Sequence, residues 1–367
     1  MKRILHVIPT LDRSGAEKQM SMLVRGLPKD EFDLHVCVLT RTGPLETELR
    51  EAGVPLTFIN KRWRADPMAY FRLRRAVERL KPDLVHTWLF AANSYGRAAG
   101  IARGVKCLVA GERCVDPWKG WLELSIDRRL ARRTTRIVAN SPGVQEFYVG
   151  HGLPAEKFVV IPNGIRPATP SPIPRDELLA ELGITESCFL IGLVGRLWAQ
   201  KRIKDAIWAA DLLKVIRKDF HLLVIGEGPH RPRLEIFRDQ CRMADRVHFL
   251  GHRSDVPRLL PHFDVFWSAS AYEGQSNSIM EAMAAGVPVV GTDIPGTRDL
   301  VVHGQTGFLV PLGDRAAIAR QTNTLFNDAA LRQRFGQSGR ERMLSEFTVE
   351  QMIQRYAELY RELLGNA

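Results

Sequence analysis

The chain has 367 residues, of which 45% are hydrophobic, so it is long enough to bury two cores of ordinary size. Its apolar runs fall short of the roughly 20 residues that span a bilayer. Its five scattered cysteines form neither a disulfide framework nor a close zinc-binding pair. These features predict two domains in a reducing compartment, and we expect the protein to be cytoplasmic.

Positive charge is concentrated in the first half of the sequence. Residues 1–165 contain 27 Lys and Arg against 17 Asp and Glu, whereas the remainder contains 25 against 24. The net charge of +11 therefore lies almost entirely in the first half. This asymmetry predicts an anionic partner for that half, such as phospholipid, a phosphorylated acceptor or nucleic acid.

The first half alternates short runs of Val, Ile and Leu with amphipathic stretches. This rhythm predicts an α/β fold, with parallel strands joined by helices that cover both faces of a sheet. The predicted strands are residues 3–9, 34–40, 54–59, 84–88, 107–111, 137–140 and 158–162. Together they predict an N-terminal Rossmann-like domain over residues 1–165, whose positive charge suits the binding of an acceptor.

Open α/β sheets bind ligands at the carboxyl ends of their strands, and three features of this half lie there. Gly15 belongs to a small turn between the first strand and a helix, where a ligand can approach the backbone. His86 lies near the carboxyl end of the strand at 84–88, and Glu112 with Arg113 follows the next strand as a candidate acceptor contact. An ordinary turn and a structural histidine are the alternatives.

Four prolines occur within residues 166–174, which predicts a linker because proline cannot continue a helix or a central strand. The strand–helix rhythm then restarts and predicts a second Rossmann-like domain over residues 175–346. Residues 347–367 contain an amphipathic helix from Val349 to Leu364. The predicted strands of the second domain are residues 189–195, 222–226, 247–251, 264–268, 287–291 and 308–311.

Two cations, Arg196 and Lys201, follow the first strand of the second domain and stand five positions apart. The planar fork of arginine and the mobile point charge of lysine together suit a diphosphate. Two solvated cations on a loop are the alternative interpretation.

The most informative stretch runs from Glu273 to Val290 and reads Glu-Gly-Gln-Ser-Asn-Ser-Ile-Met-Glu-Ala-Met-Ala-Ala-Gly-Val-Pro-Val-Val. Glu273 falls in the loop after the strand at 264–268, and Glu281 falls on a helix predicted from about residue 277 to 285. The N-cap types Ser276 and Asn277 place backbone N–H groups beside both acids. An anion-ready helix start between two hydroxyl-binding carboxylates fits a nucleotide sugar, whose diphosphate is anionic and whose sugars are rich in hydroxyls.

These motifs resemble those of glycosyltransferase family 4, which are retaining enzymes of the GT-B fold. The resemblance spans essentially the whole chain and is strongest from Gly192 to Val310. It implies two Rossmann-like domains whose parallel sheets face an interdomain cleft, with a C-terminal helix that crosses back to the N-terminal domain. Two positions depart from the family pattern: Ser14 replaces the first glycine of its Gly-Gly-x-Glu loop, and Trp88 replaces the second histidine of its His-x-His motif.

The resemblance implies a retaining hexosyltransferase that moves a sugar from a UDP- or GDP-linked donor to a lipid-linked or polysaccharide acceptor in cell-surface glycan biosynthesis. In the implied site, cations hold the donor diphosphate, Glu273 binds the reacting sugar and Glu281 holds the ribose. His86 contacts the sugar from the other domain, so catalysis is expected to require closure of the cleft. The implied catalytic residues are His86, Glu273, Arg196 and Lys201, and the implied donor-binding residues are Gly15, Arg253, Gln275, Ser276, Asn277 and Glu281.

We expect neither a metal nor a cofactor, because the chain lacks an Asp-x-Asp motif, a Gly-x4-Gly-Lys-Ser/Thr phosphate loop and a Gly-x-Gly-x-x-Gly turn after its first strand. Cations alternate with aromatic residues at 61–64, 70–75 and 118–121. This composition favours peripheral binding to the anionic cytoplasmic face of a membrane over nucleic acid, and a solvated basic face is the alternative. The alternatives are a non-catalytic basic binding protein on a GT-B scaffold, and another GT-B enzyme such as a sugar-nucleotide epimerase.

Overall fold

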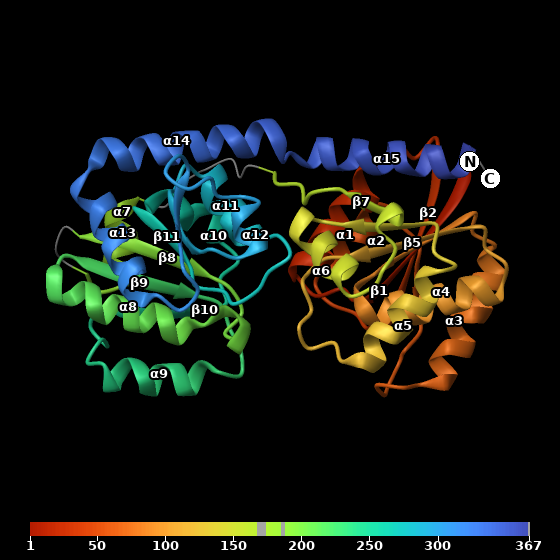
Figure 1. Ribbon diagram of the computed structural model, residues 1–367, viewed down its shortest axis with the longest axis horizontal. Coiled ribbons are helices and arrows are strands. Elements are labelled where there is room, and N and C mark those ends of the chain that lie inside the picture. Colours follow the sequence, from red (N-terminus) through yellow and green to blue (C-terminus); the bar gives the residue numbers. More distant parts are fainter. Residues whose placement is uncertain (167–173, 185–187, 366–367) are drawn as a thin grey trace. The chain divides into compact units, whose positions relative to one another are not determined.

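The computed structural model describes residues 1–166, 174–184 and 188–365 (Figure 1). The chain divides into two compact units, which we call unit 1 (Met1–Gly164 and Thr348–Ala367) and unit 2 (Ile165–Phe347). Residues 167–173 of the predicted linker lie outside the described residues. Within the described ranges, no helix has the length and apolar character needed to cross a membrane.

In the part of the chain that the structure describes, unit 1 is built on a parallel sheet of seven strands in the order β3-β2-β1-β4-β5-β6-β7. Each strand predicted in the first half is present, with ends that differ by at most two residues. The strands are β1 (Lys2–Thr10), β2 (Phe32–Arg41), β3 (Leu56–Phe58), β4 (Leu84–Trp88), β5 (Cys107–Glu112), β6 (Arg136–Ala139) and β7 (Phe158–Val160).

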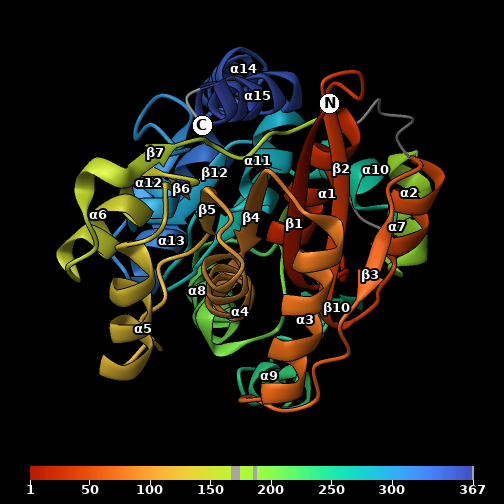
Figure 2. The same cartoon turned by 90° about the vertical axis from the view of Figure 1, so that its right-hand side faces the viewer.

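Helices cover both faces of this sheet. On one face α1, α2 and α15 share a core with β1, β2 and β4, and on the other α3 and α4 pack against the same strands. Figure 2 shows α4 between α3 and α5. The helices are α1 (Gly15–Gly26), α2 (Leu45–Glu51), α3 (Pro67–Leu80), α4 (Leu89–Ala102), α5 (Trp121–Ala131), α6 (Pro142–Gly150), the 3-10 turn η1 (Ala155–Lys157) and α15 (Val349–Gly365).

The last helix, α15, completes unit 1 although unit 2 precedes it in the sequence. Its apolar stripe, which includes Met352, Tyr356 and Tyr360, is buried against β1, β4 and α1. The expected return of the C-terminal helix to the N-terminal domain is therefore confirmed.

Unit 2 repeats the architecture with a parallel sheet in the order β10-β9-β8-β11-β12-β13 among the described residues. Its strands are β8 (Phe189–Val194), β9 (Phe220–Ile225), β10 (Val247–Gly251), β11 (Val265–Ser268), β12 (Val289–Thr292) and β13 (Gly307–Val310). Its helices are α7 (Arg175–Glu181), η2 (Ala199–Lys201), α8 (Ile203–Ile216), α9 (Arg231–Gln240), α10 (Val256–Leu259), η3 (Leu260–His262), α11 (Asn277–Ala284), α12 (Pro295–Arg298), α13 (Arg315–Asn327) and α14 (Ala329–Glu346).

Both sheets have the strand order of a Rossmann fold, so each has a point where the chain reverses its direction of travel across the sheet. This switch point lies between β1 and β4 in unit 1 and between β8 and β11 in unit 2. Ligands of open α/β sheets bind beside the carboxyl ends of the strands at such points, because the two outgoing loops diverge there. The fold of unit 2 therefore predicts a ligand-binding site at the loops after β8 and β11.

Candidate active site

The loops after β8 and β11 emerge side by side at the switch point of unit 2. β8 pairs with β11 in parallel through Ile191–Val265 and Gly192–Phe266. The loop after β8 carries the predicted Arg196 and Lys201, and the loop after β11 carries Glu273. The strand order therefore brings together two motifs that are about 70 residues apart in the sequence.

Lys201 and Glu273 form an ion pair between Nζ and Oε1. Lys201 ends the short turn η2, and its side chain packs over Gly195, where a β-carbon would lie 3.3 Å from its Cε. Only 19% of the lysine side chain and 10% of the glutamate side chain are exposed. The sequence predicted both residues as catalytic, and the structure places them in direct contact.

Gln200, which the sequence interpretation missed, ties the same two loops together. Its side-chain amide donates to the main-chain carbonyl of Tyr272 at 2.8 Å, and its main-chain carbonyl accepts from the N–H of Ala271 at 2.8 Å. The loop bearing Lys201 is thereby fixed to the loop bearing Glu273 independently of the ion pair. Its position directly before Lys201 was the available signal.

Arg196 lies in the same loop as Lys201 but remains exposed. Its guanidinium carbon is 5.6 Å from the centre of the Trp198 ring, a distance typical of a cation–π contact. Trp198 is itself 52% exposed. This contact orients the guanidinium while leaving its N–H groups accessible to an anion.

The residues after Glu273 lead into α11 as predicted. Gln275 and Ser276 are buried, Asn277 begins the helix, and the hydroxyls of Ser276 and Ser278 lie 3.1 Å apart. Glu281 lies on the second turn of α11 and is partly exposed. Glu273 in the loop and Glu281 on the helix therefore occupy the elements that the sequence assigned to them, while their roles toward a donor stay predictions.

The start of α12 supports the backbone around Glu273. A β-carbon at Gly296 would lie 2.5 Å from the carbonyl oxygen of Gly274 and 2.9 Å from the carbonyl carbon of Glu273. Such distances exclude any side chain at position 296. The close approach of the two backbones leaves the Glu273 loop little room to shift at this point.

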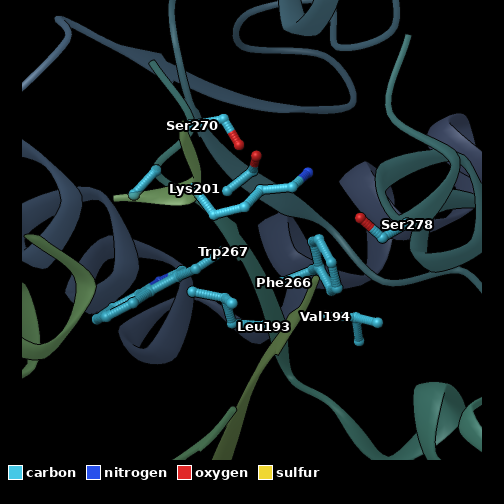
Figure 3. Close-up of a pocket in the computed structure, with 9 residues that line it drawn as sticks. Leu193, Val194, Lys201, Phe266, Trp267, Ser270 and Ser278 are labelled. Atoms are coloured by element: carbon cyan, nitrogen blue, oxygen red, sulfur yellow. The ribbon is translucent and has the colours of Figure 1, made fainter. Parts of the chain in front are cut away.

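A small pocket opens beside this pair. It is lined by polar groups from Lys201, Ser270 and Ser278 and by apolar side chains that include Phe266 and Trp267. Figure 3 shows the Lys201 side chain extended, with its amine end directed to the side on which Ser278 lies. The pocket offers one cation and several hydroxyls to a polar, anionic ligand.

Arg253 follows β10, and its guanidinium is already engaged by two carboxylates. It donates to both oxygens of Asp255 at 2.9 and 2.7 Å and forms an ion pair with Glu181. These hydrogen bonds, first to Asp255 and then to Glu181, raise the pKa of Arg253 above its ordinary value. The geometry supports a structural role, and its predicted donor contact stays a prediction.

In unit 1, the side chain of His86 is fully buried and lies in an aromatic cluster. Its Nδ1 is 2.6 Å from the Tyr360 hydroxyl of α15, and its ring is 4.6 Å from Trp88 and 5.3 Å from His6, centre to centre. Burial lowers the pKa of His86 well below its ordinary value, with smaller effects of His6 and Arg113. The ring is therefore neutral at neutral pH.

This burial does not fit the prediction that His86 contacts the donor sugar. Side chains alternate along β4, so Leu84, His86 and Trp88 all point to the face that α15 covers. The sequence located the residue at the correct strand end but could not show that a helix 274 residues later packs over it. His86 thus has a structural role in the core of unit 1, and its predicted contact with the donor sugar stays a prediction.

Gly15 is the first residue of α1, directly after the switch-point strand β1. Glu17, which is 4% exposed, accepts hydrogen bonds from the hydroxyls of Thr10, at 3.0 Å, and Ser14. Ser14 adopts φ −92° and ψ 174°, a conformation open to any residue, so serine replaces the family's glycine without strain. The predicted donor contact at Gly15 stays a prediction.

Glu112 and Arg113 also point inward rather than toward an acceptor. Arg113 donates to the Tyr356 hydroxyl at 3.1 Å and to the side-chain carbonyl of Asn163. Glu112 is 1% exposed, and burial raises its pKa despite the nearby Lys119. The proposed acceptor role of this dipeptide is not supported.

Comparison with known proteins agrees with this geometry. Residues 13–169 match the family model described as Glycosyltransferase Family 4, and residues 188–328 match the model described as Glycosyl transferases group 1. The chain is 31% identical to EpsD of Bacillus subtilis (strain 168), a protein described as a glycosyltransferase, over 79% of each protein. It is 26% identical to the UDP-Gal:alpha-D-GlcNAc-diphosphoundecaprenol alpha-1,3-galactosyltransferase of Escherichia coli over 99% of this chain and 98% of that protein.

Among solved structures, the chain resembles Anabaena HepE in complex with UDP and glucose, with a TM-score of 0.88 and 24% identity over 99% of this chain and 100% of that one. The two switch-point sheets and these likenesses define the class of protein, a glycosyltransferase of the GT-B fold. Within that class, the chain belongs to glycosyltransferase family 4.

Proposed function

We propose that the protein is a retaining glycosyltransferase that transfers a sugar from a nucleoside-diphosphate sugar, UDP- or GDP-linked, to a lipid-linked or polysaccharide acceptor in cell-surface glycan biosynthesis. The observation that carries this proposal is the Lys201–Glu273 ion pair at the switch point of unit 2, with Arg196 in the same loop. A cation pair for a diphosphate and a carboxylate for a sugar lie within two adjacent loops.

In the proposed reaction, the bond between the anomeric carbon and the donor phosphate oxygen breaks, and a bond to the acceptor hydroxyl oxygen forms on the same face of the sugar. The hydroxyl proton passes to the departing phosphate oxygen, so the nucleoside diphosphate itself serves as the base. Lys201 and Arg196 stabilise the negative charge that develops on the diphosphate. Glu273 stabilises positive charge near the anomeric carbon or binds sugar hydroxyls, and Glu281 binds the ribose.

The names of relatives support the donor and acceptor classes. The Escherichia coli relative is named for UDP-galactose and a diphosphoundecaprenol acceptor, and HepE was solved with UDP and with UDP-glucose. We propose that this protein needs neither a metal nor a cofactor, because Lys201 and Arg196 supply the positive charge for the diphosphate.

A thermal-shift screen with UDP-, GDP- and ADP-sugars tests the donor class. We expect a UDP- or GDP-sugar to raise the melting temperature of the wild type, and the Lys201→Ala variant to lose that rise. Lys218→Ala, at an exposed position outside the site, is the matched control and should respond like the wild type. A wild type that responds to none of these donors contradicts the proposal and favours a non-catalytic binding protein.

Product analysis tests the mechanism. The anomeric configuration, read by NMR of the isolated product, should match that of the donor, and transfer should survive EDTA. An inverted product, or strict dependence on added Mg²⁺ or Mn²⁺, contradicts the retaining, metal-independent mechanism. Consumption of the donor without any acceptor indicates an epimerase instead.

The acceptor class needs its own assay, because two matched relatives are named for a water-soluble acceptor, 2-deoxystreptamine. Each candidate acceptor is supplied with the donor that gives the largest thermal shift. We expect transfer to a lipid-linked sugar diphosphate or to polysaccharide. Transfer to 2-deoxystreptamine alone contradicts the proposed acceptor class while leaving the donor class intact.

A further inference from the structure

Three tryptophans of unit 1 lie on its surface near the carboxyl edge of the seven-stranded sheet. Trp63 is 63% exposed, Trp118 52% and Trp121 79%, and Leu122 beside them is 52% exposed. Isolated exposed apolar residues are common, but large aromatic side chains are costly to leave in water. Several such side chains on one surface are typical of an interaction site.

These residues belong to one surface although they come from two segments. Trp63 lies before α3, and Trp121 and Leu122 begin α5; the Arg64 guanidinium bonds to the Glu123 carboxylate at 2.7 Å and joins the two segments. Trp118 packs edge-on against Phe90 at the start of α4, with 5.5 Å between ring centres. The surface thus covers the N-terminal ends of α3, α4 and α5, which lie side by side in Figure 2.

Buried polar anchors hold both segments in place. Between Trp118 and Trp121, the side chain of Lys119 is fully buried and donates to Tyr148 at 2.7 Å and to Asp127 at 3.0 Å. Its chain neighbours are thereby fixed while their rings remain outside.

Asp66 holds in place the segment that carries Trp63, as Lys119 does for the segment that carries Trp118 and Trp121. It is 2% exposed, and its carboxylate accepts from the backbone N–H groups of Arg62 and Ala69, each at 2.9 Å. The exposed tryptophans therefore belong to two segments whose backbones are held by buried hydrogen bonds.

The segments that carry the tryptophans are rich in positive charge. Residues 61–81 contain eight Lys and Arg against two Asp and Glu, and residues 120–133, which exclude the buried Lys119, contain four against two. Arg62, Arg75 and Arg129 are among the exposed cations of these segments, and Met68 and Phe71 extend the apolar surface along α3. Tryptophan settles at the level of lipid headgroups, and cations beside it are attracted to anionic lipid.

We propose that this surface, formed by Trp63, Trp118, Trp121 and Leu122 with the exposed arginines of the same segments, docks unit 1 onto an anionic phospholipid bilayer. The rings enter the headgroup region and the guanidiniums contact lipid phosphates. This inference deepens the proposed function, since a lipid-linked acceptor resides in such a bilayer. Only the biological purpose of docking rests on the proposed function. Docking itself needs neither donor nor acceptor.

Vesicle co-sedimentation without donor or acceptor tests the proposal, with vesicles of phosphatidylcholine alone and of phosphatidylcholine mixed equally with phosphatidylglycerol. We expect the wild type to bind the mixed vesicles much more tightly. The affinity of the double variant Trp63→Ser/Trp121→Ser for the mixed vesicles should be lower than that of the wild type by a factor of about ten or more. Arg62→Gln and Arg75→Gln should each weaken binding about fivefold.

The double variant Val215→Ser/Ile236→Ser is the matched control, because it removes two exposed apolar side chains from unit 2. It should bind as the wild type does. Equal binding of the wild type to both vesicle types, or no binding to either, overturns the proposal. Unchanged binding of the tryptophan variant also overturns it, because the surface would then act by charge alone.

A second measurement uses only the wild-type protein and so does not depend on the folding of any variant. Phosphatidylcholine brominated near the headgroup should quench the tryptophan fluorescence of the bound protein, and absence of quenching overturns ring insertion. Transfer to a water-soluble acceptor analogue is assayed separately. Absence of docking by the wild type with transfer intact contradicts this inference alone, whereas absence of transfer by the wild type with docking intact contradicts the proposed function alone.

Discussion

The Lys201 ammonium and the Glu273 carboxylate are paired across the switch point of unit 2, although the residues are 72 positions apart in the sequence. Both side chains are largely shielded from water, so their attraction is stronger than that of an exposed ion pair. The pair holds each side chain in position before any ligand arrives, which is the preorganisation that electrostatic catalysis requires.

Replacing Lys201 by alanine should lower kcat about a hundredfold or more at saturating donor, because one preorganised contact to the developing phosphate charge is lost. Steady-state kinetics with the donor identified by thermal shift measures the effect. The exposed Lys218→Ala control should retain wild-type kcat. A Lys201→Ala variant with normal kcat and raised KM would show that Lys201 serves donor binding and not the chemical step.

Replacing Gly296 by alanine should impair catalysis although residue 296 carries no functional group. The new β-carbon meets the backbone of Gly274 and Glu273, so the Glu273 loop must shift from the position in which it pairs with Lys201. We expect kcat to fall at least tenfold, since displacements of about 1 Å have large effects on positioned groups. Gly150→Ala is the control, because nothing lies within 4 Å of its added β-carbon, and equal kinetics of the two variants would contradict the steric argument.

Unit 1 should lose stability as the pH falls below neutrality. Burial lowers the pKa of His6 to about 3 and the pKa of His86 well below its ordinary value, whereas both are about 6.5 in the unfolded chain. Below pH 6.5 the unfolded state therefore binds protons that the folded state does not. The stabilisation is complete above that pH and declines as the pH falls below it, by about 1.4 kcal/mol per pH unit for each histidine, down to about pH 3 for His6.

Urea denaturation at several pH values, followed by hydrogen exchange of peptides from β1 and β4, measures this dependence. His86→Gln removes one titrating group while keeping an acceptor for the Tyr360 hydroxyl. The variant should show a shallower decline in the free energy of unfolding between pH 6.5 and 4. An unchanged slope would mean that His86 does not contribute to the acid sensitivity.

Lys119→Met should destabilise unit 1 by about 3–5 kcal/mol, because the buried carboxylates of Glu112 and Asp127 lose their shared cation. In the folded protein, burial alone would lower the pKa of Lys119, but the carboxylates outweigh burial and raise it. Thermal unfolding measures the loss. Lys106→Met, an exposed lysine of unit 1, is the control, and equal melting temperatures of the two variants would contradict the anchoring role.

Much of the fold follows from local sequence signals. Buried parallel strands such as β8 and β9 appear as continuous apolar runs, and turns and amphipathic helices separate them. The placement of Glu273 in a loop and Glu281 on α11 followed from helix-start signals. These features depend on interactions between residues close together in the chain, so they can be predicted from the sequence.

The contacts that the sequence could not predict are long-range. The Lys201–Glu273 pair depends on β8 and β11 being neighbours, and the environment of His86 depends on Tyr360 of the last helix. Arg253 likewise pairs with Glu181, which lies 72 residues earlier in the sequence. In each case a residue type was correctly located on its element, but its partner was set by tertiary packing.

The closing position of α15 in unit 1 has a consequence for synthesis of the chain. Residues 1–164 are synthesised before Thr348–Gly365, and until that helix arrives the face of the sheet around Ile4, Leu34 and Val109 lacks the part of its cover that α15 supplies. Unit 1 can therefore complete its core only after the whole of unit 2 has been synthesised. A chain truncated before α15 would keep all of unit 2 and yet leave the core of unit 1 incomplete.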